Sequence, residues 1–204
     1  MKLKMKKKQM SIFLGALMLF STIAFGLFSD KSDEPTPNDN LPVFLQSWNG
    51  MDIFVNPDGI VYWLNFGQFS LPFRSNPAEA ALVDSEPASD DIFLKFMNAS
   101  KVYLVFDPDE RITIAVPYAE TARLLSGRSF EIIPAISQEY PAENESFVIR
   151  DPWEQKPGEL VIYFDIANTT RLNMQDNTLV VQGPNQQEIT LASVKFALIM
   201  WRLI

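Results

Sequence analysis

Three aspartates are the residues of this chain whose types and positions could support chemistry. Asp107 and Asp109 follow the short apolar run at 101–106 (KVYLVF), and Asp165 lies near the end of a similar run at 160–166 (LVIYFDI). Continuous apolar runs of this length are typical of strands that are covered on both faces. In α/β sheets, ligands bind at the carboxyl ends of such strands. If the two strands are neighbours, Asp107 and Asp165 face one crevice.

These carboxylates support three interpretations. Asp107, Asp109 and Asp165 could hold a hard cation such as Mg²⁺ or Ca²⁺, for which carboxylate oxygens are common protein ligands. They could instead share general acid and base roles. The most common use of an aspartate at such a place is to cap the turn or helix that follows the strand. The sequence indicates no other cofactor.

Composition excludes several kinds of catalysis. The 204 residues contain no cysteine and no histidine, which removes Ser-His-Asp and Cys-His nucleophile systems, the usual zinc ligand sets and haem attachment. The sequence also lacks a glycine-rich phosphate loop and a Gly-x-Ser-x-Gly elbow. A non-enzymatic role is therefore favoured. Absence of cysteine also fits a prokaryotic surface protein that is held together by its core alone.

The second half of the chain has an α/β pattern that would position the aspartates. After the strand at 101–106, apolar residues of 115–126 recur at helical spacing, with Pro117 expected in the first turn and Gly127 just past the end. A further strand is expected at 130–136, which completes a β-α-β unit. Beyond the run that contains Asp165, residues 172–174 and 178–182 flank a short polar turn and predict a hairpin.

The first half of the domain has a β pattern. Residues 51–55 and 60–64 flank the turn Asn56-Pro57-Asp58-Gly59, which predicts a hairpin. A further extended segment is expected at 68–74, although Pro72 makes it a poor central strand. Residues 76–91 are acidic and rich in proline, alanine and serine, so a long loop and a possible subdivision of the domain are expected there. The fold class is therefore α/β or α+β.

Aromatic residues are concentrated in the same first half. The members of this group are Trp48, Trp63, Phe66, Phe69 and Phe73. Exposed aromatic rings beside polar groups can bind sugars or peptides. The more common role of such rings is to fill a core, because large apolar side chains dominate the free energy of burial.

The C-terminal segment predicts an unusually apolar helix. Asn185 and Glu188 have the spacing of a helix-capping pair, and residues 191–204 (LASVKFALIMWRLI) are apolar nearly all round. Glu188, Lys195 and Arg202 are seven residues apart and form one narrow polar stripe, expected in water. Such a helix is usually buried in its own domain. A protein partner at residues 187–204, or contact with the membrane, are the alternatives.

The N-terminal residues predict a membrane anchor. Residues 1–9 contain five lysines, and residues 10–28 form an uncharged apolar run of 19 residues, close to the roughly 20 residues that span a bilayer. Because lysines stay in the cytoplasm, the N-terminus is expected on the cytoplasmic side. The lipid bilayer, reached through residues 10–28, is the first expected partner. Residues 29–42 read as a Pro-rich acidic tether, and 43–204 as an extracytoplasmic domain. A cleaved signal peptide, and a pilin-like filament subunit without the lysine-rich leader, are the alternatives.

Charge and glycosylation motifs complete the prediction. Without the five N-terminal lysines, 12 of the 17 basic residues remain against 25 acidic ones, a net charge of −13. Phosphate is repelled by such a surface, so no nucleic-acid partner is expected. Asn98, Asn144 and Asn168 begin Asn-x-Ser/Thr sequons, which can be glycosylated on an extracytoplasmic, possibly archaeal, surface.

Together these features predict a single-pass cell-membrane protein that serves as an accessory or interaction subunit of a cell-envelope assembly. The alternatives are a carboxylate- or metal-dependent enzyme that acts on envelope substrates, and the filament subunit.

Overall fold

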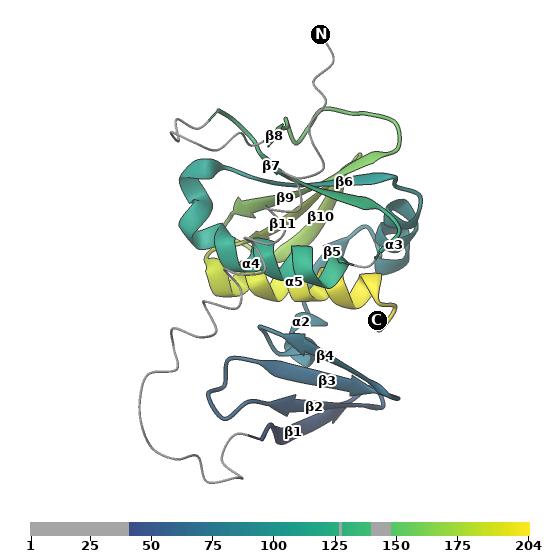
Figure 1. The fold of residues 1–204 in the computed structure, drawn as a ribbon, viewed down its shortest axis with the longest axis vertical. Coiled ribbons are helices and arrows are strands. Elements are labelled where there is room, and N and C mark those ends of the chain that lie inside the picture. The colour runs from purple at the N-terminus through teal and green to yellow at the C-terminus, as the bar shows by residue number, and fades with distance from the viewer. Residues whose placement is uncertain (1–40, 127, 140–147) are drawn as a thin grey trace, which may run out of the picture. The chain divides into compact units, whose positions relative to one another are not determined.

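The computed structural model describes residues 41–126, 128–139 and 148–204. The predicted transmembrane helix at 10–28, nearly all of the tether, Gly127 and the sequon at Asn144 lie outside these ranges. Residues 41–204 belong to one compact unit of mixed α/β structure (Figure 1). Within the described ranges, none of the helices combines the length and the apolar character needed to cross a membrane.

The first part of the domain is a four-stranded antiparallel sheet, in which the strands lie in the same order as in the sequence. Its strands are β1 (Val43–Trp48), β2 (Met51–Val55), β3 (Tyr62–Phe66) and β4 (Phe69–Phe73). The predicted hairpin is confirmed as β2 and β3, and Gly59 adopts a φ of +70° in its turn, a conformation that glycine adopts without steric cost. Pro72 is accommodated because β4 is an edge strand.

β1 was not expected from the sequence. Its pairing with β2 contains a register shift between Phe44 and Gln46. A bulge of this kind breaks the alternation of apolar and polar residues by which a strand is recognised.

The second element is a seven-stranded mixed sheet in the order β5-β10-β11-β9-β6-β7-β8. Its strands are β5 (Asp84–Glu86), β6 (Lys101–Phe106), β7 (Glu131–Ile136), β8 (Val148–Ile149), β9 (Glu159–Ile166), β10 (Arg171–Gln175) and β11 (Thr178–Gly183). The strands from β11 to β8 are mutually parallel, and β10 forms the predicted hairpin with β11. The two apolar runs that precede the candidate aspartates are therefore neighbouring parallel strands, β6 and β9.

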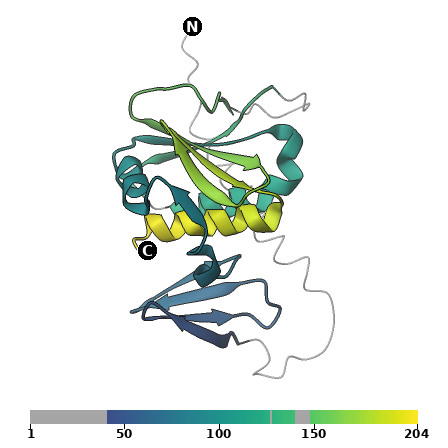
Figure 2. The same cartoon turned by 180° about the vertical axis from the view of Figure 1, so that it is seen from behind.

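Helices pack on one face of this sheet (Figures 1 and 2). The chain contains α2 (Pro77–Ala80), α3 (Ser89–Met97), the 3₁₀ turn η1 (Pro108–Glu110), α4 (Arg111–Leu125) and α5 (Gln186–Met200). Residues of α3, α4 and α5 share one apolar core with the sheet. On the opposite face, Trp153 packs against Tyr163 and Arg150 lies 4.9 Å from the centre of the Tyr103 ring.

Two expectations, for residues 76–91 and for residues 115–126, are wrong. Residues 76–91 are not a loop, because they contain α2, β5 and the start of α3. Asn76 caps α2, its side chain accepting a hydrogen bond from the Ala78 N–H.

The helix expected at 115–126 begins at Arg111 instead, because η1 leads directly into it. Pro117 is therefore inside α4 and buried, where it removes the backbone hydrogen bond to the Thr113 carbonyl.

The C-terminal helix α5 is covered on two sides, which explains its apolar composition. Its residues 189, 192, 196, 199 and 200 belong to the core beneath the seven-stranded sheet. A different stripe, Val194, Ala197 and Leu198, packs with the inner face of the four-stranded sheet. The apolar surface that suggested a partner at residues 187–204 is thus largely covered within the domain.

The ends and polar residues of α5 differ partly from expectation. Asn185 is the cap, because its side chain accepts a hydrogen bond from the Glu188 N–H at 3.0 Å. The Glu188 carboxylate accepts from the Thr170 hydroxyl instead of closing a capping box. Lys195 is not in water: it is 8% exposed and its Nζ donates to the Ala81 carbonyl at 2.7 Å. Burial lowers the pKa of Lys195, and the charge of Asp84 acts in the opposite direction.

Phe96 of α3 provides a test of the core, because its ring is fully buried and 4.8 Å from that of Phe196. We expect Phe96→Ala to lower the free energy of unfolding by about 3–5 kcal/mol through loss of burial and creation of a cavity. Leu94, which is 57% exposed on the same helix, is the matched control, and Leu94→Ala should change stability by less than about 0.5 kcal/mol. Urea unfolding of the full chain measures both. Equal losses would show that α3 does not pack as described.

Candidate functional site

Asp107 and Asp165 lie side by side at the carboxyl edge of the seven-stranded sheet. Phe106 of β6 is opposite Phe164 of β9. The residues that follow them, Asp107 and Asp165, are therefore at the same level on neighbouring strands, whose backbones are about 4.8 Å apart. The expectation that both aspartates face one region is therefore supported by the pairing. Asp107 is also a cap: its Oδ1 accepts hydrogen bonds from the Asp109 N–H at 2.9 Å and from the Gln138 side chain at 3.1 Å.

The third carboxylate of this group is Glu110, not Asp109. η1 follows Asp107, and a 3₁₀ turn has three residues per turn, so residue 110 returns above residue 107. Asp109 remains exposed. Glu110 is half-buried, and its Oε2 is shielded from solvent without a hydrogen-bond partner. The sequence did not single out Glu110. The signal that could have found it is the Asp-Pro-x-Glu spacing that starts a 3₁₀ turn.

The closeness of these carboxylates affects their ionisation. Burial raises the pKa of Glu110, and the charges of Asp165 and Asp107 raise it further. Burial also raises the pKa of Asp165, while a hydrogen bond from the Ile166 backbone opposes both shifts. The pKa of Tyr163 is raised to about 12 by burial and then by the charges of Asp165, Glu110 and Asp107. In the cluster formed by Asp107, Glu110 and Asp165, the carboxyls of Glu110 and Asp165 therefore have raised pKa values and retain a proton more readily than free carboxyls in water.

A cation held by Asp107, Asp109 and Asp165 stays a prediction, and Asp109 is exposed. Across the residues that the structure describes, no three or more Asp, Glu, His or Cys side chains are grouped so that they could hold a metal ion. What the geometry can do chemically is hold a proton on Glu110 or Asp165 at the carboxyl edge of a parallel sheet.

Two of the three sequons can be placed. Asn98 is exposed at the end of α3, where its Nδ2 donates to the Leu94 carbonyl at 2.9 Å. Asn168 is exposed in the connection between β9 and β10. Glycosylation requires an accessible asparagine, so both positions are compatible with it. Use of the sequons, including that at Asn144, stays a prediction.

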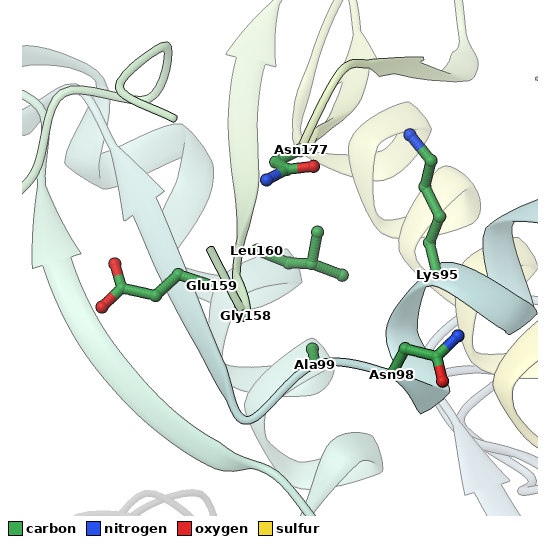
Figure 3. A pocket seen from close by; sticks show the side chains of 7 residues that line it. All are labelled: Lys95, Asn98, Ala99, Gly158, Glu159, Leu160 and Asn177. Atoms are coloured by element: carbon green, nitrogen blue, oxygen red, sulfur yellow. The ribbon is translucent and has the colours of Figure 1, made fainter. Parts of the chain in front are cut away.

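A small cavity lies at the opposite edge of the sheet, near the start of β9 (Figure 3). Its volume is about 220 Å³, and its polar lining includes Lys95, Asn98, Glu159 and Asn177. The Lys95 ammonium donates to the Asp176 carbonyl at 2.5 Å. Pockets for small ligands are usually about 300–1,000 Å³, so this cavity is small for a ligand site.

The outer face of the four-stranded sheet carries a row of apolar side chains. Phe44, Phe54, Trp63 and Pro72 are paired in register across β1 to β4, so they lie side by side on one face. Residues of the neighbouring rung, including the fully buried Ile53 and Leu64, pack inward. The Phe44 and Phe54 rings are 5.7 Å apart in an edge-to-face contact.

A row of polar side chains runs parallel to this apolar row. Its members are Ser47, Asp52, Asn65 and Ser70, again paired in register across the four strands. The Ser47 hydroxyl donates to Asp52 Oδ1 at 2.7 Å, and the Ser70 hydroxyl donates to Asn65 Oδ1 at 2.5 Å. Asp52 Oδ2 and Asn65 Nδ2 remain available for other hydrogen bonds. We name the two rows together the sheet platform.

The region around the platform is rich in exposed apolar residues and poor in charge. Residues 41–73 contain two charged side chains, Asp52 and Asp58, and no lysine or arginine. Six of the 14 exposed large hydrophobic residues of the described chain lie in this segment. They are Leu41, Val43, Phe44, Leu45, Ile60 and Phe69. Apolar residues gathered in this way mark interaction surfaces more often than single exposed residues do.

No protein-family model, curated protein or solved structure matches this chain.

Glu110→Gln tests the carboxylate cluster. The raised pKa means that the folded protein binds a proton at Glu110 more tightly than the unfolded chain does. The contribution to stability is full below about pH 4.5, the unperturbed value, and is lost as the pH rises through the folded pKa. We expect Glu110→Gln to raise the midpoint of thermal unfolding by a few degrees at pH 7 and to change it little near pH 4.

Asp109→Asn removes an exposed charge from the same turn and is the matched control for this comparison. It should not reproduce the pH-dependent difference. A Glu110→Gln variant that is less stable than the wild type at pH 7 would contradict the described cluster.

Proposed function

We propose that this chain is a membrane-anchored, extracytoplasmic accessory subunit of a cell-envelope assembly, and that it binds its partner through the sheet platform. The single observation that carries this proposal is the outer face of the four-stranded sheet, where an apolar row and a polar row lie in register. The sheet already buries its inner face against α5. Its outer aromatic residues are therefore not needed to join it to the rest of the domain.

Membrane attachment is supported by the sequence pattern. The five lysines of residues 1–9 precede the uncharged run at 10–28, which favours an N-terminus in the cytoplasm. β1 begins at Val43, so about 14 tether residues separate it from the proposed span. At about 3.3–3.6 Å per residue, such a tether reaches at most about 50 Å when fully extended. The platform would accordingly meet envelope components close to the bilayer.

A second candidate function is acid–base catalysis by the cluster of Asp107, Glu110 and Asp165. The observation that favours it is the shielded Oε2 of Glu110, together with the raised pKa of that carboxyl. Perturbed carboxyls are concentrated at catalytic sites, although structural clusters show them as well. Wild-type and Asp165→Asn chains would be incubated with isolated envelope material and the products compared by mass spectrometry. A product that requires Asp165 supports catalysis, and identical products contradict it.

Single-cysteine labelling tests the topology, because the chain contains no cysteine. We expect Ser32→Cys, in the tether, to react with a membrane-impermeant maleimide in intact cells. Lys4→Cys should react only after the cells are opened, since it would lie in the cytoplasm. Loss of the Lys4→Cys label from the mature chain would indicate a cleaved signal peptide, and labelling of both sites in intact cells would contradict the proposed orientation.

Site-specific photocrosslinking tests the interaction surface. We expect a photoreactive phenylalanine analogue at position 44 to form a reproducible adduct with an envelope component in intact cells, because Phe44 is 53% exposed on the platform. The control is position 112, where Ile112 is 82% exposed on α4. Adducts at both positions, or at position 112 alone, would contradict a partner bound through the platform.

A further inference from the structure

We propose that the sheet platform binds an uncharged polysaccharide chain of the cell envelope. This inference rests on the proposed function, because it names the chemical class of the partner that the platform would meet. Its basis is the pairing of an aromatic row with a polar row on one face of the sheet.

A pyranose ring has two kinds of surface. The apolar row of the platform suits one of them, and the polar row suits the other. The C–H bonds of its faces are apolar, and its hydroxyl groups extend around the edge. Aromatic rings offer apolar contact area with a negatively polarised face, which suits the C–H face of a sugar. Phe44, Phe54 and Trp63 place aromatic rings on adjacent strands. The Phe44 and Phe54 rings are inclined at 76° to each other, so one sugar face stacks on one of these two rings and on Trp63.

The tryptophan of the row is held in place before any ligand arrives. The Trp63 indole N–H donates to Asn56 Oδ1 at 2.9 Å, which restricts rotation of the ring. Phe44 and Phe54 restrain each other through their edge-to-face contact. A preorganised surface loses less conformational entropy when it binds, so these contacts favour recognition of a ligand rather than adaptable packing.

The polar row provides hydrogen bonds for the sugar edge. Asp52 Oδ1 and Asn65 Oδ1 are engaged by the serine hydroxyls, which leaves Asp52 Oδ2 to accept and Asn65 Nδ2 to donate. Hydroxyl groups do both, so they can satisfy this pair. Asp52 and Phe54 are two residues apart on β2, about 7 Å along the strand. A sugar stacked on the aromatic row can therefore reach the polar row with its edge.

The dimensions of the platform favour a chain over a single sugar. Three strand spacings of about 4.8 Å give a row of about 14 Å from β1 to β4. β1 and β4 are the edges of this sheet. At the β4 end the guanidinium of Arg123 donates to the Pro72 carbonyl at 2.5 Å, so a polymer that continues past the row meets Arg123 there.

Charge selects among the possible partners. No lysine or arginine occurs between residues 41 and 73, whereas Asp52 and Asp58 are both present. Arg123 of α4 reaches the Pro72 carbonyl at one end of the row, but its guanidinium is ion-paired with Glu120. An acidic polysaccharide, or an anionic lipid surface, would therefore be repelled by the Asp52 carboxylate of the polar row. Insertion of the aromatic row into a bilayer would also carry the Asp52 carboxylate toward the lipid, which is costly. A neutral glycan avoids both costs.

Binding of defined oligosaccharides to the full chain tests the inference. The probes are cellohexaose, maltohexaose, mannohexaose and chitohexaose as neutral hexasaccharides, hexagalacturonic acid as an acidic one, and phosphatidylcholine vesicles. We expect at least one neutral hexasaccharide to bind, with at least tenfold weaker binding for Trp63→Ala and for Asp52→Ala. Isothermal titration calorimetry gives the affinities. Hexagalacturonic acid and the vesicles should not bind through Trp63.

Trp153→Ala is the matched control, because Trp153 is 48% exposed but belongs to the segment that covers the seven-stranded sheet. It should leave the affinity unchanged. Asp52→Asn keeps the size of the side chain and one acceptor oxygen, so it should fold normally and bind more weakly than the wild type. Thermal unfolding of each variant separates a loss of binding from a loss of fold.

Several outcomes would overturn the inference. If no neutral hexasaccharide binds while position 44 crosslinks to an envelope protein, the inference of a glycan ligand is wrong and the proposed function stands. If neither binding nor crosslinking is found, both fail. Preferred binding of hexagalacturonic acid, or vesicle binding that depends on Trp63, would replace the neutral glycan by another class of ligand. Neutral binding that survives Trp63→Ala would place the site elsewhere.

Discussion

Burial of α5 between two sheets is the constraint on which the rest of this domain depends. One stripe of the helix, including Phe196, packs beneath the seven-stranded sheet, and another, including Val194 and Leu198, packs on the four-stranded sheet. α4 lies alongside, and the guanidinium of Arg128 donates to the Met200 carbonyl at the end of the helix. α4, which has the same length, contributes Leu125 to the first core and Leu124 to the second, so α5 and α4 together join the two layers into one unit. Among the described residues, the outer face of the smaller sheet takes no part in either core.

The dual burial also explains the unusual position of Lys195. A lysine in so apolar a helix would be expected to reach solvent, yet both sides of α5 are covered. The aliphatic part of the side chain lies among apolar neighbours, and the ammonium reaches the carbonyl of Ala81 at the end of α2. The Ala81 carbonyl, in the connection between the two sheets, thus accepts the hydrogen bond of the lysine in α5.

Local patterns predict most of the strands but not β1, β5 or β8, and they miss the consequences of tertiary contact. The runs at 101–106 and 160–166, and the hairpins around Asn56 and Asp176, are strong signals because each is specified by neighbouring residues. The adjacency of β6 and β9 brought Asp107 and Asp165 together as expected. Glu110 was missed because a single 3₁₀ turn leaves little trace in apolar periodicity. The Pro, Ala and Ser content of residues 76–91 predicts a loop, whereas Ala80 and Val83 in this range are buried by elements distant in sequence. The in-register rows of the platform require the bulged pairing of β1, which no local rule gives.

The position of α5 has a consequence for the order of folding. The four-stranded sheet is made first among the described elements, but the helix that covers its inner face is made last. During synthesis, Ile53 and Leu64 lack their partners Val194 and Leu198 until more than 120 further residues have been made. Contacts between segments so far apart slow folding and prolong exposure of apolar surface. Until α5 is made, the inner face of the four-stranded sheet therefore keeps apolar side chains open to wrong contacts.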